Sequence, residues 1–309
     1  MQKTAVVILF LIVTLTWGTT WLAMQIAVQT VPPLFATGMR FIFAAPFLIT
    51  IAYATKTPLL FPSGQRLFQV IISIFYFSIP FTLMIYGEKY VSSGLASVIF
   101  STMPVAVMVA SVLILRTQTN ALQIAGLALS TIALTCIIFN ESKSGYGGQW
   151  LGVLALITAV IMHSILYTCC KKRSCNVSVI TFNALPCLLA GILLIITGWV
   201  SEKPDLHSFS ASSILATFYL GAFAGVFGIL CYFALQKKAG AFKASLVFLI
   251  FPVIAFFLEN KVYGNSISIS SLFLIIPLLT GILLSLIPVK NPDSLLKSDS
   301  PDTKSIESE

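Results

Sequence analysis

The stretch ASVIFSTMP (residues 96–104) returns in altered form as ASLVFLIFP (residues 244–252). Both copies fit the pattern A-S-x-x-F-x-x-x-P, and they lie 148 residues apart (252 − 104), close to half the chain. Each copy follows a short polar break and opens an apolar run. A proline within a membrane helix removes one backbone hydrogen bond and can bend or break the helix. Two such helices in equivalent places predict a membrane protein of two repeats, with its site between them.

The composition is that of a protein embedded in a lipid bilayer. Hydrophobic residues make up 58% of the chain and charged residues 9%, with a mean hydropathy of +0.98, whereas a soluble domain has roughly 25% charged residues. The apolar runs are about 20 residues long, enough for a helix to cross the bilayer core, and they lack the alternating polarity of membrane β-strands. We expect an all-α integral membrane protein with ten spans near residues 5–26, 34–54, 67–86, 93–115, 121–139, 150–168, 177–199, 213–235, 244–263 and 267–288.

The basic residues are distributed unevenly between the two ends of the predicted bundle. Of the 18 Lys and Arg residues, 13 fall in one set of gaps or at the termini, four fall in the other set, and Arg40 lies inside a span. The positive-inside rule therefore places both termini and the loop 169–176 in the cytoplasm, and the loops 141–148 and 201–212 outside. Because the cations lie between apolar runs, nucleic acid is not a predicted partner.

This topology makes the two halves inverted in the membrane. The fourth helix, with Pro104, runs from outside to inside, and the ninth helix, with Pro252, runs the other way. We expect a first five-helix repeat over residues 1–140, a second over 141–288, and a disordered cytoplasmic tail over 289–309. Inverted repeats are a common plan among secondary transporters, because exchanging the two half-structures turns a central site from one side to the other.

At this point the residues resemble the EamA-type family of the drug/metabolite transporter superfamily. The resemblance lies in WGTTW (17–21), PPLFA (32–36) followed by Arg40-Phe41, YVSSGLAS (90–97) through Met103-Pro104, and PVIA (252–255). It implies ten helices around a central cavity in a bacterial inner membrane, and transport of small metabolites, often export of amino acids or drugs. Some members of the family instead move nucleosides, cofactors such as S-adenosylmethionine, or lipidic amines.

The chain departs from the family pattern at several positions. The family usually ends the fourth and ninth helices with Leu-Gly-Glu, whereas this chain has Leu115-Arg116-Thr117 and Tyr263-Gly264-Asn265. His163 stands where the sixth helix commonly has Trp, and Glu259 where the ninth usually has an apolar residue. Any role of the missing glutamates cannot be carried over.

Arg40 and Glu259 are the charged candidates for a functional site. Arg40 lies ~9 Å below the outer surface, and Glu259 lies ~7–8 Å from the outer end of its helix. Arg40 either reaches the outer headgroups or faces the cavity and holds a substrate carboxylate. Glu259 either belongs to a hydrated loop, or pairs with Arg40, or binds a proton or cation. Because their depths agree, we predict an Arg40–Glu259 pair that latches the outer gate.

Aromatic and polar residues supply the other candidates. His163 could carry a coupling proton or bond a neighbouring carbonyl as a neutral ring. Trp17 and Trp21 share one helix face and could wall a substrate, while Ser101 could bond either a substrate or its own helix. The predicted substrate-binding residues are Trp17, Thr20, Trp21, Arg40, Tyr86, Ser101, His163, Tyr167, Phe248 and Glu259, and the predicted gating residues are Pro104 and Pro252.

The sequence thus predicts a secondary active transporter of a small organic metabolite that works by alternating access, and it favours an exporter of an amino acid or a related compound. The alternative is an importer or exchanger of a nucleoside-like cofactor such as S-adenosylmethionine; a different class is a membrane-embedded enzyme or sensor. No phosphate-binding loop, acid–base pair or metal-ligand spacing is present, so we expect no enzymatic activity, cofactor or metal. The expected partners are a small-molecule substrate, the lipid bilayer, and a proton or ion as coupling species, for a monomer or weak homodimer.

Overall fold

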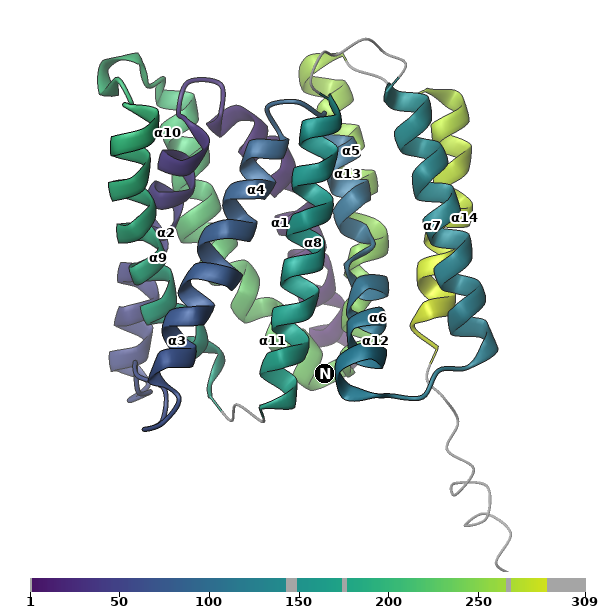
Figure 1. Cartoon of the computed structure of the whole chain (residues 1–309), viewed down its shortest axis with the longest axis horizontal. Coiled ribbons are helices and arrows are strands. Elements are labelled where there is room, and N and C mark those ends of the chain that lie inside the picture. Colours follow the sequence, from purple (N-terminus) through teal and green to yellow (C-terminus); the bar gives the residue numbers. More distant parts are fainter. Residues whose placement is uncertain (1, 143–148, 174–176, 265–267, 288–309) are drawn as a thin grey trace, which may run out of the picture.

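All regular structure in the described part of the chain is helical. The computed structural model describes residues 2–142, 149–173, 177–264 and 268–287 (Figure 1). Within these ranges nine helices are long and apolar enough to cross a membrane, and a shorter apolar helix, Ile269–Ser285, is the tenth. This confirms the predicted all-α membrane fold with ten helices. The expected tail 289–309 lies outside the described residues.

The spans agree with the predicted ones to within a few residues. In the first half they are α1 (Gln2–Ala27), α2 (Pro33–Ala54), the continuous series α3 (Arg66–Ile72), η1 (Ser73–Ser78) and α4 (Ile79–Gly87), the broken helix α5 (Ser93–Ser101) and α6 (Met103–Leu115), and α7 (Ala121–Ser142). In the second half they are α8 (Gln149–Lys172), α9 (Val179–Glu202), the series α10 (Ala211–Phe218), η3 (Tyr219–Gly228) and α11 (Ile229–Ala239), the broken helix α12 (Ala241–Ser245) and α13 (Val247–Tyr263), and α14 (Ile269–Ser285). A short 3₁₀ turn, η2 (Leu206–Ser208), precedes α10.

Matched helix endings mark the repeat in the backbone. Arg116, just beyond α6, and Gly264, just beyond α13, have φ values of 55° and 69° and lie 148 residues apart (264 − 116). Lys56 and Lys203, beyond α2 and α9, have φ values of 54° and 47° and lie 147 residues apart (203 − 56). A left-handed residue satisfies the last carbonyls of a helix and turns the chain away. Equivalent helices in the two halves therefore end in the same way.

The third span of each half contains a π-helical segment. In the first half it is η1, and in the second half it is η3, which covers the positions 148 residues after η1. Single π-helical turns within α-helices occur frequently at functional sites, because they widen the helix and displace its side chains. Tyr76 and Phe77 of η1 and Ala224 and Gly225 of η3 line the cavity described below.

The two proline-bearing helices are interrupted at different places. The first is interrupted at Thr102, so Pro104 lies in the first turn of α6, where its missing N–H costs no intrahelical bond. The second is interrupted earlier, at Leu246, and Pro252 lies inside α13. Only Pro104 therefore adjoins a break in its helix.

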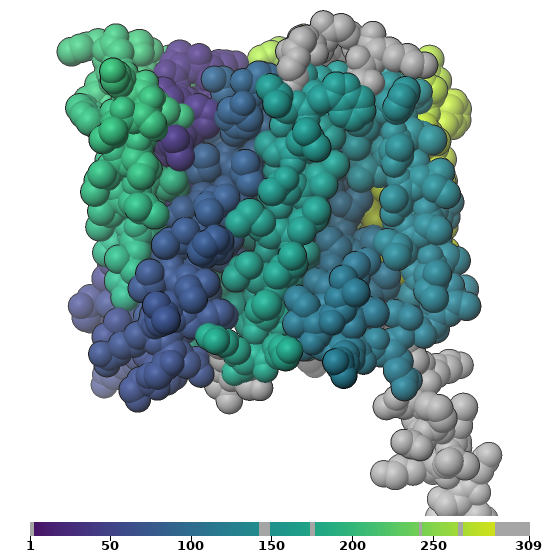
Figure 2. Space-filling view, viewed as in Figure 1, coloured from purple at the N-terminus to yellow at the C-terminus, as the bar shows by residue number. Residues whose placement is uncertain are grey.

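The helices pair across the two halves. α2 packs most extensively on α9, and α7 on α14, and these pairs stand at opposite edges of the bundle (Figure 1). α1 packs on α13 as α8 packs on α6, while the space-filling view shows α3 and α4 beside α8 (Figure 2). Small residues permit the close approaches: a Cβ on Gly126 would lie 2.5 Å from the carbonyl oxygen of Gly281. Such contacts hold membrane helices together where lipid removes the hydrophobic driving force.

The outer surface is apolar, as a lipid-facing surface must be. Large side chains such as Leu113, Val200, Phe273 and Ile276 are more than half exposed. A soluble monomer rarely exposes contiguous apolar surface on this scale. The membrane-length helices and the apolar exterior together identify a multi-pass membrane protein.

The orientation of the bundle gives a first testable prediction. We expect Lys171→Cys to react with a membrane-impermeant maleimide only from the cytoplasmic side, and Asp205→Cys only from outside, in a background without the six native cysteines. Both positions are exposed, so each cysteine should react once the reagent reaches its side of the membrane. Labelling of Lys171→Cys in intact cells would contradict the predicted topology.

Candidate functional site

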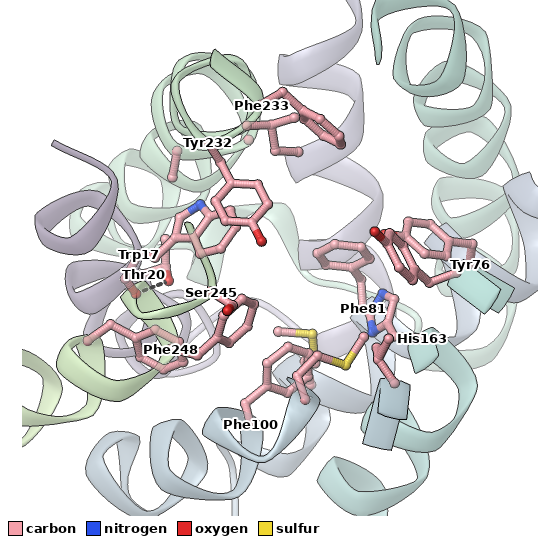
Figure 3. A pocket seen from close by; sticks show the side chains of 18 of the residues that line it. Trp17, Thr20, Tyr76, Phe81, Phe100, His163, Tyr232, Phe233, Ser245 and Phe248 are labelled. Atoms are coloured by element: carbon pink, nitrogen blue, oxygen red, sulfur yellow. Dashed lines mark hydrogen bonds between the residues drawn. The ribbon is translucent and has the colours of Figure 1, made fainter. Parts of the chain in front are cut away.

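A cavity of about 480 Å³ lies at the centre of the bundle (Figure 3). Its walls come from both halves, with residues of α1, α2, η1 and α4 to α6 from the first and α8, α9, η3 and α11 to α13 from the second. The volume is within the range of small-molecule sites, which run from about 300 to about 1,000 Å³. The cavity thus has the place and size of a site for a small metabolite.

Aromatic rings make up most of the wall. The side chains of Trp17, Tyr232 and Phe248 lie on one side of the cavity, with the Trp17 ring centroid 4.7 Å from that of Tyr232 and 5.7 Å from that of Phe248 (Figure 3). One helical turn further along α1, Trp21 stacks on Phe251 at 6.0 Å. The interlocked rings form a rigid apolar surface on which a planar or aliphatic group can pack.

The only charged side chain in the described lining is Arg40. It is 8% exposed, its guanidinium carbon lies 4.7 Å from the Phe81 ring centroid, and Nη1 lies 3.9 Å from the Met24 sulfur. These are weak partners for a guanidinium with five donors. Arg40 therefore faces the cavity rather than the outer headgroups and offers donors to an anion within it.

The backbone of α2 at Arg40 is held by a close contact with η3. A Cβ on Gly221 would collide with the carbonyl oxygen of Arg40. Glycine at this position therefore allows η3 to approach α2 and fixes the depth at which the guanidinium enters the cavity.

His163 lies across the cavity from Trp17, in an aromatic surrounding. Its ring is edge-on to Tyr76 and Phe81, with centroids 4.9 and 5.0 Å away, and lies 5.9 Å from Phe100 (Figure 3). These rings come from η1, α4 and α5, so His163 joins α8 to the first half. The arrangement orients the imidazole toward the cavity that Arg40 also lines.

Most predicted site residues meet at this cavity. Its lining includes Trp17, Thr20, Trp21, Arg40, His163, Tyr167, Phe248 and Pro104. The lining residues that the sequence did not single out are mainly aromatic and polar, and they include Tyr76, Phe81, Phe100, Phe182, Asn183, Tyr232, Gln236 and Ser245. A signal was present for Asn183 and Gln236, since an amide within an apolar span requires a polar surrounding.

Four predicted residues lie elsewhere. Ser101 donates to the carbonyl of Val98 in its own helix, at 2.7 Å, and Tyr86 donates to the Tyr90 hydroxyl at 3.3 Å. Pro252 is buried within the bundle, away from the cavity lining. Glu259 lies within α13, which continues to Tyr263, and is 2% exposed, so it does not belong to a hydrated loop.

The predicted Arg40–Glu259 pair is wrong. Glu259 accepts a hydrogen bond from the backbone N–H of Gly94 at 2.6 Å, at the start of α5, whereas Arg40 contacts Phe81 and Met24. The two residues have similar depths, but α2 packs on α9 and η3 while α13 packs on α1 and α5. Equal depth does not place two side chains on facing helices.

The cavity extends toward one end of the bundle. Gln236, Ser245 and Tyr167 line it next to the basic residues 237–243 and 171–173, on the N-terminal side. At the opposite end the buried side chains of Met24, Val31, Ile85, Val91, Leu95 and Ala255 belong to one hydrophobic cluster. The described lining therefore reaches the cation-rich end of the bundle.

The fold and the cavity define a membrane transporter of the inverted-repeat class. One family model, described as the EamA-like transporter family, matches residues 4–139 and again residues 150–287. These two matches cover most of the chain, so the chain belongs to the EamA-like transporter family.

The chain is similar to several bacterial proteins over most of their length, and some of them are named as transporters. The chain is 64% identical to the protein PagO of Salmonella typhimurium over 287 residues, covering 93% of this chain and 94% of PagO. It is 54% identical to an uncharacterized transporter of Buchnera aphidicola from Schizaphis graminum over 289 residues, 94% and 96% of the two chains. It is 25% identical over 256 residues to the uncharacterized inner membrane transporter YedA of Escherichia coli, 82% and 81% of the two chains.

The fold matches a known crystal structure. The TM-score is 0.64 at 18% sequence identity, and the match covers 96% of this chain and 99% of that one. The similarity establishes a shared fold over nearly the whole length.

The contact between η3 and α2 gives a second prediction. We expect Gly221→Ala to lower the thermal stability of the purified protein, because overpacking against a backbone atom costs about 1–3 kcal/mol, more than the ~1 kcal/mol that Ala gains in helix propensity. Ala222→Ser, at the half-buried neighbouring position, serves as the control and should change the unfolding temperature little. Equal stability of Gly221→Ala and the wild type would contradict the contact.

Proposed function

We propose that this transporter is a secondary active exporter of a small organic metabolite that carries a carboxylate, an amino acid or a related compound. The observation that carries the proposal is the buried guanidinium of Arg40 in an otherwise aromatic cavity. A cation at this depth costs at least ~2–3 kcal/mol without a partner. A substrate carboxylate would supply that partner, with two parallel hydrogen bonds to the planar guanidinium.

The rest of the cavity fits the remaining parts of such a substrate. The rings of Trp17, Tyr232 and Phe248 offer faces for an aromatic or branched side chain. No carboxylate is among the described lining residues, so an amino group would rest on an aromatic face by a cation–π contact. The same walls would reject a second negative charge.

Alternating access is supported by the inverted repeat and by the one-sided cavity. By the positive-inside rule, the end to which the cavity extends is cytoplasmic, with both termini on that side. The site would then load from the cytoplasm in this conformation and release outside in its inverted counterpart. The chain contains no phosphate-binding loop, which supports an ion gradient or substrate exchange as the energy source and argues against an enzymatic step.

The location and assembly state follow from the same reasoning. We infer a bacterial inner-membrane protein, because its relatives are bacterial transporters and one of them is named as an inner membrane protein. The cavity is complete within one chain, which supports function as a monomer or weak homodimer.

Ligand binding at Arg40 gives the third prediction. Among amino acids, organic acids, their carboxamides and nucleoside-like cofactors, compounds with a free carboxylate should raise the unfolding temperature of the purified protein. Arg40→Met should weaken binding of the best carboxylate by about 10- to 100-fold, because a charge-assisted hydrogen bond contributes about 1.5–3 kcal/mol.

Two controls make this result specific. The matching carboxamide should bind Arg40→Met and wild type with similar affinity, and Arg40→Lys should restore part of the carboxylate affinity without the bidentate geometry. A carboxylate that binds Arg40→Met as tightly as wild type would contradict the proposal. Stabilisation by a nucleoside-like cofactor alone would favour the alternative substrate class.

The prolines give the fourth prediction, on gating. We expect Pro104→Ala to slow export in proteoliposomes more than it lowers the yield of folded protein, because it allows α5 and α6 to join across the break beside the cavity. Pro252→Ala is the matched variant in the other half, and its effect should be smaller because α13 is continuous there. Unchanged rates in both variants would leave both prolines with a packing role.

A further inference from the structure

Two carboxyl groups are buried at the end of the bundle opposite the cavity mouth. Glu88 directly follows α4 and is 3% exposed, and Glu259 lies one turn before the end of α13 and is 2% exposed. Both adjoin the short connection between α4 and α5, which Glu88 begins and at whose far end Glu259 accepts from the Gly94 N–H. Neither lines the central cavity, so the function proposed for that cavity leaves both unexplained.

Glu259 is anchored at the start of α5. Its Oε2 accepts a hydrogen bond from the Gly94 N–H at 2.6 Å and a longer one from the Ser93 hydroxyl at 3.4 Å. A Cβ on Gly94 would lie 2.7 Å from the same oxygen and closer still to the Phe256 ring, so glycine permits this close approach. The N–H groups and the dipole at a helix N-terminus favour a negative charge. The donors at the start of α5 therefore favour a carboxylate at Glu259.

The surroundings of Glu88, unlike those of Glu259, do not stabilise a negative charge. Both of its carboxyl oxygens are buried without a hydrogen-bond partner among the described residues. Burying a bare carboxylate is costly, and the charge of Glu259 adds repulsion. Burial first, and Glu259 second, raise the pKa of Glu88 well above its ordinary value. A protonated Glu88 is the form compatible with this packing.

The polar and charged groups around Glu88 that the structure describes make contacts of their own. The charges of both carboxyl groups act on Tyr263, on α13. The Tyr263 hydroxyl accepts a hydrogen bond from the Gln29 amide at 2.7 Å. The Tyr86 hydroxyl donates to that of Tyr90. Lys89 is exposed, and the exposed Lys261 ammonium lies 5.9 Å from the Phe257 ring centroid.

Two other carboxylates at this end are engaged elsewhere. Glu202 accepts from the backbone N–H groups of Leu34 and Phe35 at 3.0 and 2.9 Å. Glu141 accepts from the Ser268 hydroxyl at 2.8 Å. Both carboxylates accept hydrogen bonds from groups at the start of a helix, as Glu259 does at Gly94. Glu88 is therefore the carboxyl group in this set that requires a proton.

We propose that Glu88 and Glu259 form a site for one proton in the closed gate opposite the cavity mouth, and that proton occupancy holds this gate shut. When the gate opens, water reaches Glu88 and its O–H bond breaks, releasing the proton to the adjoining aqueous phase. Reclosing requires Glu88 to take a proton back from the same phase. The site itself does not depend on which substrate the cavity binds.

A proton fits this site better than a metal ion. Hard cations require several oxygen ligands at short distance, whereas Glu259 faces a backbone N–H and a hydroxyl donor. A metal cation placed there would face hydrogen-bond donors, which cannot serve as its ligands. One proton on Glu88 removes the repulsion and leaves the Gly94 bond intact.

The position equivalent to Glu88 in the other half of the repeat is not ionisable, so the proposed proton site has no counterpart there. The position 148 residues after Glu88 is Gln236, which lines the cavity at its open end. An amide has the shape of a carboxylic acid but cannot ionise near neutral pH. Opening and closing of the gate at Gln236 would thus be insensitive to pH, while the gate at Glu88 responds to the pH on its own side.

The sign of the pH effect follows from linkage. The Glu88 pKa is higher when the gate is closed, so closure is fully favoured below the open-state pKa and is lost as pH rises through the closed-state pKa. Between these two values, one bound proton changes the closed-to-open ratio by about tenfold per pH unit.

Infrared difference spectroscopy of the purified full-length protein tests the proton directly. We expect the carbonyl-stretch band of a protonated carboxylic acid near neutral pH, and its loss in Glu88→Gln. Glu259→Gln should let Glu88 ionise more readily, so that the band disappears at lower pH than in wild type. Glu202→Gln, the matched change at a helix start, should keep the wild-type band.

A second measurement reports the gate itself. Spin labels at Trp150→Cys on α8 and Val262→Cys on α13, both exposed, should show a longer second distance whose share grows as pH rises. In Glu88→Gln, which mimics the protonated form and should fold well, the short distance should persist at every pH.

Three outcomes would overturn the proposal. The first is no protonated carboxyl band in folded wild-type protein near neutral pH, and the second is a band that survives in Glu88→Gln. The third is a band that Na⁺ removes at constant pH, which would assign the site to a metal cation.

Discussion

The guanidinium of Arg40, inside a membrane-embedded aromatic cavity, is the interaction on which the rest of the site depends. Lipid and packed rings offer a cation little compensation, so the surrounding structure must hold it at one depth. Gly221 fixes the backbone, and Phe81 and Met24 supply weak contacts. The hydrogen-bonding capacity that remains unsatisfied is directed at the cavity, and the proposed anionic substrate rests on it.

The inverted repeat supplies the means of moving that substrate. The cavity lies between the halves, and each half contributes a π-helical segment and a broken helix to it. The breaks are not equivalent, since one adjoins Pro104 and the other precedes Pro252 by six residues. Equivalent positions differ as well, with the buried Glu88 in one half and the cavity-lining Gln236 in the other. The halves thus share a plan but differ in their side chains.

The position of a residue along its helix could be predicted from the sequence, whereas the neighbour that its side chain faces could not. The lengths of the apolar runs, the loop charges and the repeat predicted the ten spans and placed Arg40 inside the second of them. The Arg40–Glu259 pair failed because two residues at one depth can point to different neighbours. Glu88 was passed over because it follows a helix and reads as a solvated loop residue, yet the packing of α4 against α8 and α5 against α13 buries it.

The most direct test of the account is whether the cavity becomes accessible from both sides of the membrane. Thr20 lines it on α1, and Thr20→Cys changes little in size. In a cysteine-free background, a membrane-impermeant thiol reagent should label Thr20→Cys from the cytoplasmic side without substrate, and from the outside once substrate drives the cycle. Labelling from one side only, with and without a bound and transported substrate, would contradict alternating access around this cavity.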